Sequence, residues 1–162
     1  MPDTTMNQTR QPNPPAPTIR RATTADAVAI AALVETHVAD GDLLPVTATR
    51  VAEQDADFIV ATDDGGRVVG CAHLREYSPS LAEIRSLAVD ADHAGSGLEG
   101  ALLTAIEQLA VARDYPTLFT VTNDVDFFRA RGYAPWPVPE LHPERDEVGR
   151  FAGVLARELG ED

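Results

Sequence analysis

Three glycines, Gly95, Gly97 and Gly100, form the pattern G-x-G-x-x-G between an apolar strand-like run and an apolar helical segment. A glycine-rich loop at a helix N-terminus offers backbone N–H groups and the positive end of the helix dipole to a phosphate. The same pattern marks dinucleotide-binding folds. It can also be a strand-to-helix turn that binds nothing.

The position of this loop in the chain argues against a dinucleotide site. In that fold the first glycine lies in the tight turn that directly ends a strand, within a βαβ unit. Here Asp90 to Ala94 separate Val89 from Gly95, and antiparallel-type strands come before the loop. Too little chain follows to complete a doubly wound sheet. A different phosphate cradle and a turn without ligand therefore both stay open.

Two side chains on neighbouring predicted strands are suited to proton transfer. Glu83 is the first candidate for a general base, because a carboxylate in a partly apolar cleft suits that role near neutral pH. Its alternative role is an ion pair with Arg75 or Arg85. His73 is the second candidate, and its alternative is a packed or exposed strand histidine. Cys71 has no evident acid–base partner, so a cysteine nucleophile is not favoured.

Hydrophobic periodicity predicts the elements that position these groups, in a mixed α/β order. We expect a first helix that begins after Thr23 or Thr24 and places Val28 on its apolar face. The last helix is expected at 124–132, where Gly132 ends it. We expect strands at 19–22, 58–62, 68–77, 81–90, 116–122 and 153–159, and further helices at 47–54 and 97–113. Residues 142–151 are locally helical in pattern.

Composition and charge exclude several classes of protein. The 162 residues are 44% hydrophobic, which suits one domain, and a net charge of −13 disfavours nucleic acid as a partner. A single cysteine fits a reducing compartment, so we expect a cytoplasmic protein. No run approaches the about 18 apolar residues of a membrane span. Residues 1–17 are proline-rich and predicted to be a disordered tail before a domain at 18–162.

Longer stretches around these motifs resemble the GNAT N-acetyltransferase superfamily. The segment SLAVDADHAGSGLEGALL is similar to the strand, loop and helix that hold acetyl-CoA in that superfamily. RVVGCAHLREYSPSLAEIRSLAV resembles its third and fourth strands, and LFTVTNDVDFFRARGYAP its fifth strand and next helix. These segments and GDLLP are most similar to the N-acetylglutamate synthase branch. The resemblance implies an α/β GNAT fold with a mixed central sheet, splayed fourth and fifth strands, and helices on both faces.

The resemblance also implies a reaction, the transfer of an acetyl group from acetyl-CoA to a small amine such as the amino acid glutamate. No metal is implied, and pairing into a homodimer is common in that branch. The implied acetyl-CoA contacts are groups at the end of the fourth strand and in the glycine loop, namely Leu87, Ala88, Val89, Gly95, Ser96, Gly97, Leu98, Glu99 and Gly100.

The loop departs from the superfamily pattern at two positions. Ala94 replaces an arginine or glutamine, and Glu99 replaces a small residue. A carboxylate about 5 Å from two phosphates costs on the order of 1–3 kcal/mol. This predicts CoA binding weakened roughly ten- to a hundredfold unless the Glu99 side chain points to solvent. The usual tyrosine acid is replaced by Phe128, which leaves water, Thr122 or Asn123 to protonate the thiolate.

Carboxylates of an amino-acid acceptor would be bound best by arginine. Arg85, Arg50 and Arg150 are the candidates, and each has the alternative of a solvated surface residue. Two other interpretations stay open for the whole chain. One is a catalytically impaired GNAT-fold protein that binds acyl-CoA weakly or regulates a partner. The other is an interaction domain without a CoA site, which exposed apolar surface between the splayed strands would favour.

Overall fold

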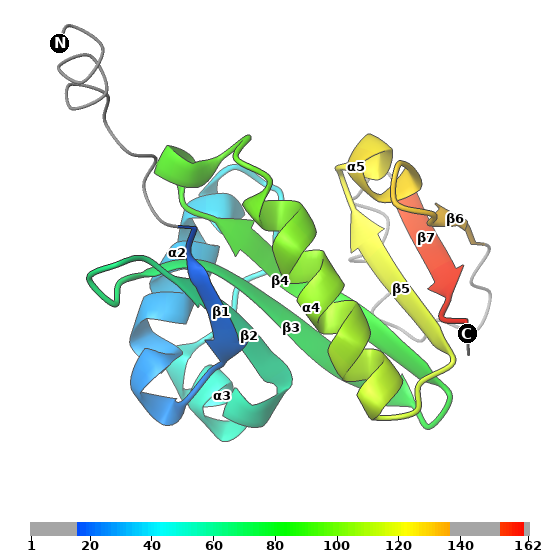
Figure 1. Ribbon diagram of the computed structural model, residues 1–162, viewed down its shortest axis with the longest axis horizontal. Coiled ribbons are helices and arrows are strands. Elements are labelled where there is room, and N and C mark those ends of the chain that lie inside the picture. Colours follow the sequence, from blue (N-terminus) through cyan, green and yellow to red (C-terminus); the bar gives the residue numbers. More distant parts are fainter. Residues whose placement is uncertain (1–15, 137–152, 161–162) are drawn as a thin grey trace, which may run out of the picture.

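The computed structural model describes residues 16–136 and 153–160 (Figure 1). In chain order the elements are β1 (Thr18–Arg21), η1 (Thr24–Asp26), α2 (Ala27–Ala39), α3 (Ala48–Glu53), η2 (Asp55–Asp57), β2 (Phe58–Thr62), β3 (Val68–Ser78), β4 (Leu81–Val89), η3 (Ala91–His93), α4 (Leu98–Ala112), β5 (Thr117–Thr122), α5 (Val125–Arg129), β6 (Ala134–Pro135) and β7 (Gly153–Glu158).

The strands form one mixed sheet in the order β1-β2-β3-β4-β5-β7-β6. β4 and β5 run parallel, and the other neighbouring pairs are antiparallel. Helix α4 runs between β4 and β5 in the chain, so it is the crossover that a parallel pair requires. The mixed sheet expected from the sequence is confirmed.

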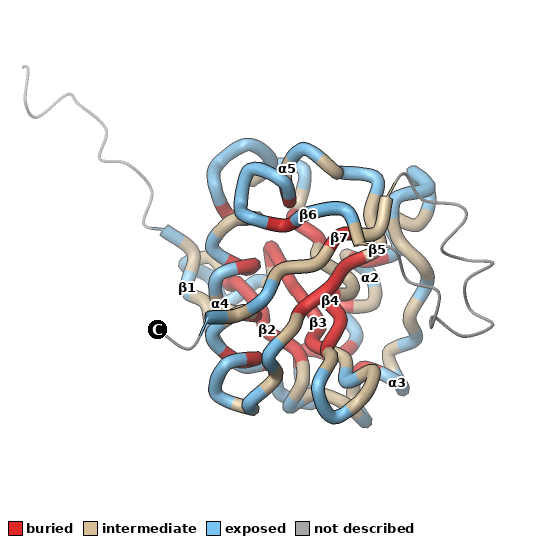
Figure 2. The backbone as a smooth tube through the Cα atoms, turned by 90° about the vertical axis from the view of Figure 1, so that its right-hand side faces the viewer, coloured by how far each residue is buried: buried red, intermediate tan, exposed pale blue. Residues whose placement is uncertain are grey.

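Helices cover both faces of this sheet, as the alternation of β2 requires. Ile59 and Ala61 join the apolar cluster under α4, whereas Phe58 and Val60 join the cluster under α2. The predicted stripe of α4 is buried at every position, at Leu98, Leu102, Ile106, Leu109 and Ala110. Buried residues gather along β3, β4 and β5 in the middle of the molecule (Figure 2).

β4 and β5 are paired over only part of their length. Their register runs from Leu81↔Thr117 to Ile84↔Thr120, although β4 continues to Val89. Figure 1 shows the two strands close at one end and separated at their C-terminal ends. The splayed pair implied by the superfamily resemblance is therefore present.

A bulge in β4 lies where the strands separate. His73 pairs with Arg85 and Cys71 pairs with Ala88, so β4 has one more residue than β3 in this interval. Ser86 has a φ of 56°, which is unusual for a residue other than glycine. The bulge exchanges the faces of the strand, because Ile84 lies in the cluster under α4 and Ala88 in the cluster under α2.

Most predicted elements match the structure to within about two residues at their ends. Two differences concern packing and short elements. Val28 is 73% exposed, because the buried stripe of α2 is Ala27, Ile30 and Val34. The two-residue strand β6 was not predicted, since it has no periodicity to detect. The predicted helical pattern at 142–151 and most of the predicted tail lie outside the described residues.

Candidate active site

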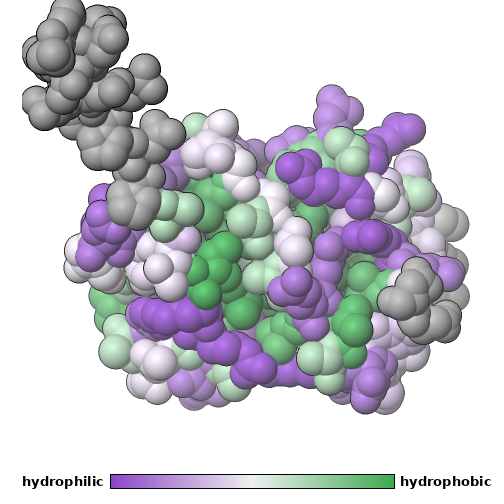
Figure 3. Space-filling model, viewed as in Figure 1, coloured by the Kyte–Doolittle hydropathy of each residue, from purple (hydrophilic) through white to green (hydrophobic). Residues whose placement is uncertain are grey.

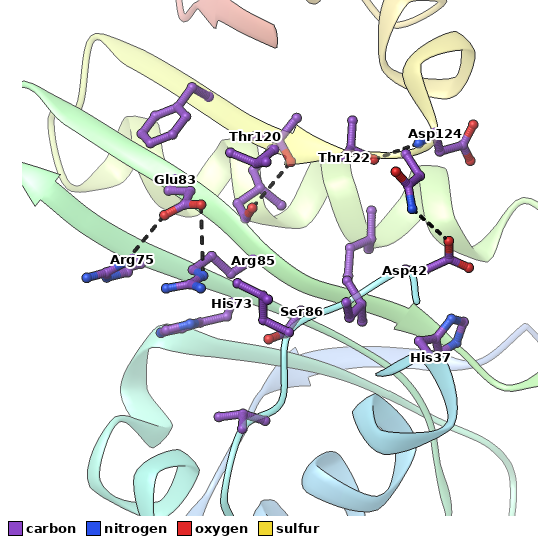
Figure 4. Close-up of a pocket in the computed structure, with 18 of the residues that line it drawn as sticks. His37, Asp42, His73, Arg75, Glu83, Arg85, Ser86, Thr120, Thr122 and Asp124 are labelled. Atoms are coloured by element: carbon purple, nitrogen blue, oxygen red, sulfur yellow. Dashed lines mark hydrogen bonds and ion pairs between the residues drawn. The ribbon is translucent and has the colours of Figure 1, made fainter. Parts of the chain in front are cut away.

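A cavity of about 720 Å³ opens where β4 and β5 diverge. Its walls come from β3, β4, β5, the first turn of α4, the short helix α5 with the residue before it, and the segment 42–47 that precedes α3, together with single residues of α2 and α3. Figure 4 shows the lining side chains projecting into this space from opposite sides. The splay of two parallel strands thus produces the main structural requirement of a binding site, a concave surface.

One end of the cavity, here called the arginine end, consists of Arg75, Glu83, Arg85 and His73. The carboxylate of Glu83 is buried, and its oxygens lie 3.6 Å from Arg75 Nη1 and 3.8 Å from Arg85 Nε. Figure 4 shows Glu83 between the two guanidinium groups. Two cations beside one buried anion compensate its lost hydration and leave a net positive charge at this end.

His73 is held in place by stacking. Its ring lies parallel to that of Phe58 with centroids 4.1 Å apart, and the residue is buried. Burial lowers the pKa of His73 to about 4, with Asp57 opposing and Arg85 and Arg75 adding to the effect. The imidazole is therefore neutral at pH 7. The alternative of a packed strand histidine describes its contacts, and it also lines the cavity.

Val89 and Glu99 line the cavity where β4 leads towards α4, and this part, together with the adjoining loop 94–97 and the first turn of α4, is here called the helix end. Gly95 and Gly97 have φ values of 77° and 90°, a region that favours glycine. Ala101 N donates to Gly97 O at 3.1 Å and makes the first intrahelical bond. The N–H groups of Leu98 to Gly100 precede that bond, so the helix leaves them without partners.

The helix end fits a phosphate-bearing ligand such as CoA in its backbone and less well in one side chain. Three free N–H groups and the helix dipole suit an anion. Just before the loop in the sequence, at the end of η3, Nδ1 of His93 is buried and has no hydrogen-bond partner within residues 16–136 and 153–160. Glu99, however, lines the cavity from the same helical turn. The structure therefore combines free backbone N–H groups with one carboxylate at this end of the cavity.

Side-chain contacts connect the walls near the end of β4 and β5. His37 Nε2 lies 3.0 Å from the carbonyl oxygen of Val89. Asn123 Nδ2 donates to Gly41 O at 3.3 Å and to Asp42 Oδ1 at 3.1 Å. The loop before α3 is thereby linked to the end of β5, which fixes the width of the cavity on this side.

The remaining predicted residues differ in how they relate to the cavity. Arg50 is exposed and lines it from α3. Thr122 lines it as well, and its Oγ1 accepts a hydrogen bond from Asp124 N at 2.8 Å. Ala88 is instead buried in the cluster under α2. Arg150 lies outside the described residues.

Aromatic packing explains the position where the tyrosine acid is missing. Phe128 is buried and makes edge contacts with Phe127 and Tyr133, at centroid distances of 5.0 and 5.3 Å. The Tyr133 hydroxyl donates to Glu107 Oε2 at 2.7 Å, away from any acid role. Phe127 and Phe128 both reach the cavity wall while belonging to the core.

The sequence did not single out His37, Asp42 or Tyr77 as site residues. They line the cavity from α2, from the loop after it and from β3. No local motif surrounds them, and only the tertiary packing brings them to the same cavity. Within the described part of the chain, no cluster of three metal-ligand side chains occurs, and no helix has the length and hydrophobicity to cross a bilayer.

The chain belongs to the acetyltransferase (GNAT) family, whose sequence model matches residues 30–133. It is 35% identical over 127 residues to an amino-acid acetyltransferase of Mycobacterium tuberculosis, covering 77% of this chain and 72% of that protein. It is also 35% identical over 115 residues to an uncharacterized N-acetyltransferase of Chlorobaculum tepidum, covering 71% and 74%.

Solved structures with the same fold have been obtained with CoA. The N-acetylglutamate synthase of Neisseria gonorrhoeae, complexed with CoA and N-acetyl-glutamate, superposes with a TM-score of 0.81 at 27% identity. The match covers 90% of this chain but only 35% of the synthase chain. A Mycobacterium tuberculosis protein in complex with CoA gives a TM-score of 0.77 at 28% identity, covering 89% of this chain and 100% of that one.

Proposed function

We propose that this chain is an acetyl-CoA-dependent N-acetyltransferase with an amino acid as its acceptor. An N–C bond forms at the acceptor amine while the thioester C–S bond breaks, and the amine proton and the thiolate are the two sites of proton transfer. Acetyl-CoA supplies the activated acetyl group. The amino-acid acetyltransferase relative and the synthase complex with N-acetyl-glutamate support this acceptor class, and glutamate is the first compound to test.

The observation that carries the proposal is the group of cations beside one carboxylate at the arginine end. Arg75 and Arg85 line the cavity there together with Glu83 (Figure 4). An α-amino acid has its ammonium and carboxylate groups on the same carbon, so guanidinium groups that bind the carboxylate bring the amine close to Glu83. Arg50 adds a third cation on α3 for a side-chain carboxylate.

Glu83 is the proposed general base. It is the carboxylate at the arginine end, on the strand whose far end borders the glycine loop. His73 is the weaker candidate, because a neutral imidazole with a pKa of about 4 binds a proton poorly at pH 7. Thr122 is the proposed proton donor to the thiolate, since its oxygen already accepts from Asp124 N and its own proton is free to be donated.

The proposed contacts to acetyl-CoA are mainly backbone groups. The N–H groups of Leu98, Glu99 and Gly100 would face the diphosphate, and the end of β4 at Leu87 and Val89 would border the pantetheine arm. The described large hydrophobic residues with high exposure are Val28 and Val111, on α2 and α4. Figure 3 shows hydrophilic side chains interrupting the hydrophobic ones on the α4 face. Neither residue borders the splayed strands, so an interaction domain is not favoured.

The decisive experiment combines CoA calorimetry with an acetylation assay on a panel of amino acids. Binding of CoA followed by release of free thiol with glutamate, and less with lysine or putrescine, is the expected result. Binding without turnover for any amine would favour the impaired GNAT-fold protein. An absence of binding by a folded chain would contradict the proposed function.

A further inference from the structure

We propose that the guanidinium of Arg131 binds the diphosphate of the acyl donor and supplies the cation that the glycine loop lacks. This inference rests on the proposed function, because it assigns a residue to the donor half of the same site. Arg131 lies after α5, far in sequence from the loop at 94–100. No sequence motif connects the two segments.

The geometry places Arg131 on the first turn of α4. A Cβ atom added at Gly100 would lie 2.8 Å from Arg131 Nη2 and 3.2 Å from Nε. Gly100 is the third residue of α4, and its N–H is one of the three without a helical partner. The absence of a Cβ at Gly100 thus leaves room for the guanidinium against the first turn of α4, the turn that carries the free N–H groups.

Arg131 is held in that orientation by Phe127 of α5, the short helix that it follows. Its Nη1 donates to Phe127 O at 3.1 Å, and its Cζ lies 4.0 Å from the centroid of the Phe127 ring. These contacts engage one nitrogen and one face of the guanidinium. The other two nitrogens point towards Gly100, so the group is oriented before any ligand arrives.

The charge of Arg131 is not compensated within residues 16–136 and 153–160. Six arginines of this part form ion pairs with carboxylates, and Arg131 is not among them. In a chain with a net charge of −13, a rigid and unpaired arginine beside a helix N-terminus attracts an anion. The bidentate geometry of guanidinium suits phosphate oxygens.

Arg131 also accounts for the two departures of the loop. Ala94 removes a cation from the loop, and Glu99 adds an anion on the turn that Arg131 covers. A guanidinium from a different element restores the local balance without changing the loop sequence. The loop therefore keeps a phosphate cradle in which backbone and cation come from separate segments.

The test is calorimetric binding of CoA, dephospho-CoA and pantetheine to the whole chain and to Arg131→Ala. We expect CoA binding to weaken about tenfold in the variant, and pantetheine binding to stay unchanged because it lacks the diphosphate. Dephospho-CoA retains the diphosphate and lacks the ribose 3′-phosphate, so its affinity should fall by the same factor as that of CoA.

Two variants serve as matched controls. Arg129→Ala removes an exposed arginine from the end of α5, two residues before Arg131, and should leave CoA binding unchanged. Gly100→Ala keeps every charge but inserts a methyl group where Arg131 Nη2 lies, so it should weaken CoA binding as well. In the Arg131→Ala background the Gly100→Ala change should add little, because the group that it displaces is gone.

The outcomes separate this inference from the proposed function. If the unmodified chain does not bind CoA, both are wrong. If it binds CoA and Arg131→Ala binds equally well, or no more weakly than Arg129→Ala, the inference alone is wrong. If the loss disappears with dephospho-CoA, Arg131 contacts the 3′-phosphate and the diphosphate assignment is overturned.

Discussion

The two ends of the cavity recognise ligands by different means. The arginine end consists of side chains that hold one another, with Glu83 between Arg75 and Arg85 and His73 stacked on Phe58. The helix end consists of backbone groups whose direction is set by glycine torsions. We therefore expect the backbone groups to tolerate side-chain changes such as Ala94 and Glu99 better than the cluster of paired charges tolerates substitution.

The largest effect is expected from Glu83→Gln at the arginine end. If Glu83 is the base, kcat falls about a hundredfold or more, because general-base catalysis contributes on the order of 10²–10⁴. Steady-state kinetics with glutamate measures this, and CoA affinity by calorimetry should be unchanged since the helix end is intact. A change confined to KM would instead identify Glu83 as a residue that positions the arginines.

The second effect is a pH dependence of the free energy of unfolding, which His73 at the arginine end produces. The folded pKa of His73, about 4, lies below the ordinary value of 6.5, so the unfolded chain binds a proton more readily. The stabilising contribution of neutral His73 is present above pH 6.5 and is lost as the pH falls towards 4. Between pH 7 and pH 5 the free energy of unfolding should drop by about 2 kcal/mol from this group.

Urea unfolding of the unmodified chain and of His73→Gln at both pH values isolates that contribution. The variant should lack this part of the pH dependence, since glutamine does not titrate. Equal slopes for both proteins would contradict the burial effect at His73.

An intermediate effect is expected at the link between Asn123 and Asp42, where Asp42 lies away from the arginine end (Figure 4). Asp42→Ala removes one hydrogen bond across the cavity. The loss weakens the link between the loop before α3 and the end of β5 by about 0.5–1.5 kcal/mol. The KM for the acceptor should rise roughly two- to tenfold with little change in CoA affinity. Asp40→Ala, an exposed aspartate on the same turn, is the control, and an equal rise there would indicate a general charge effect.

The smallest effect is expected at the helix end itself. Glu99→Gln should tighten CoA binding about two- to fivefold at low salt, because one like charge is removed from a partly exposed position. The gain should vanish near about 0.5 M NaCl, where screening is strong. Glu35→Gln on α2 serves as the control of equal net charge. Weaker binding by Glu99→Gln would mean that the carboxylate does not oppose the donor.

The same contrast explains what the sequence could predict. Gly95, Gly97 and Gly132 mark positive-φ positions, so the loop before α4 and the end of α5 were predictable from local rules. The elements from β2 to β5 follow from periodicity alone. Glu83 and its alternative partners were recognised, but not that both arginines engage it, because that depends on the register of β3 against β4.

Other features depend on packing between distant segments. The contact of Arg131 with Gly100 depends on how α5 settles against α4, and the link from Asn123 to Asp42 depends on the loop before α3. Val28 shows the same limit within one helix, since an apolar residue at a plausible spacing lies on the solvent face. Local patterns do not record which of two similar faces the rest of the chain covers.

The extra residue in β4 has a consequence for evolution and for engineering. Successive residues of a strand point to opposite faces of the sheet, and the bulge at Ser86 shifts this alternation by one residue. Upstream of the shift Glu83 and Arg85 share one parity, and downstream Leu87 and Val89 continue it on the opposite face. Deleting one residue here would restore the regular alternation. The residues of β4 after Ser86 would then exchange faces of the sheet. β4 should therefore be transplanted only with its extra residue, because that residue keeps Glu83 and Arg85 on one face and Leu87 and Val89 on the other.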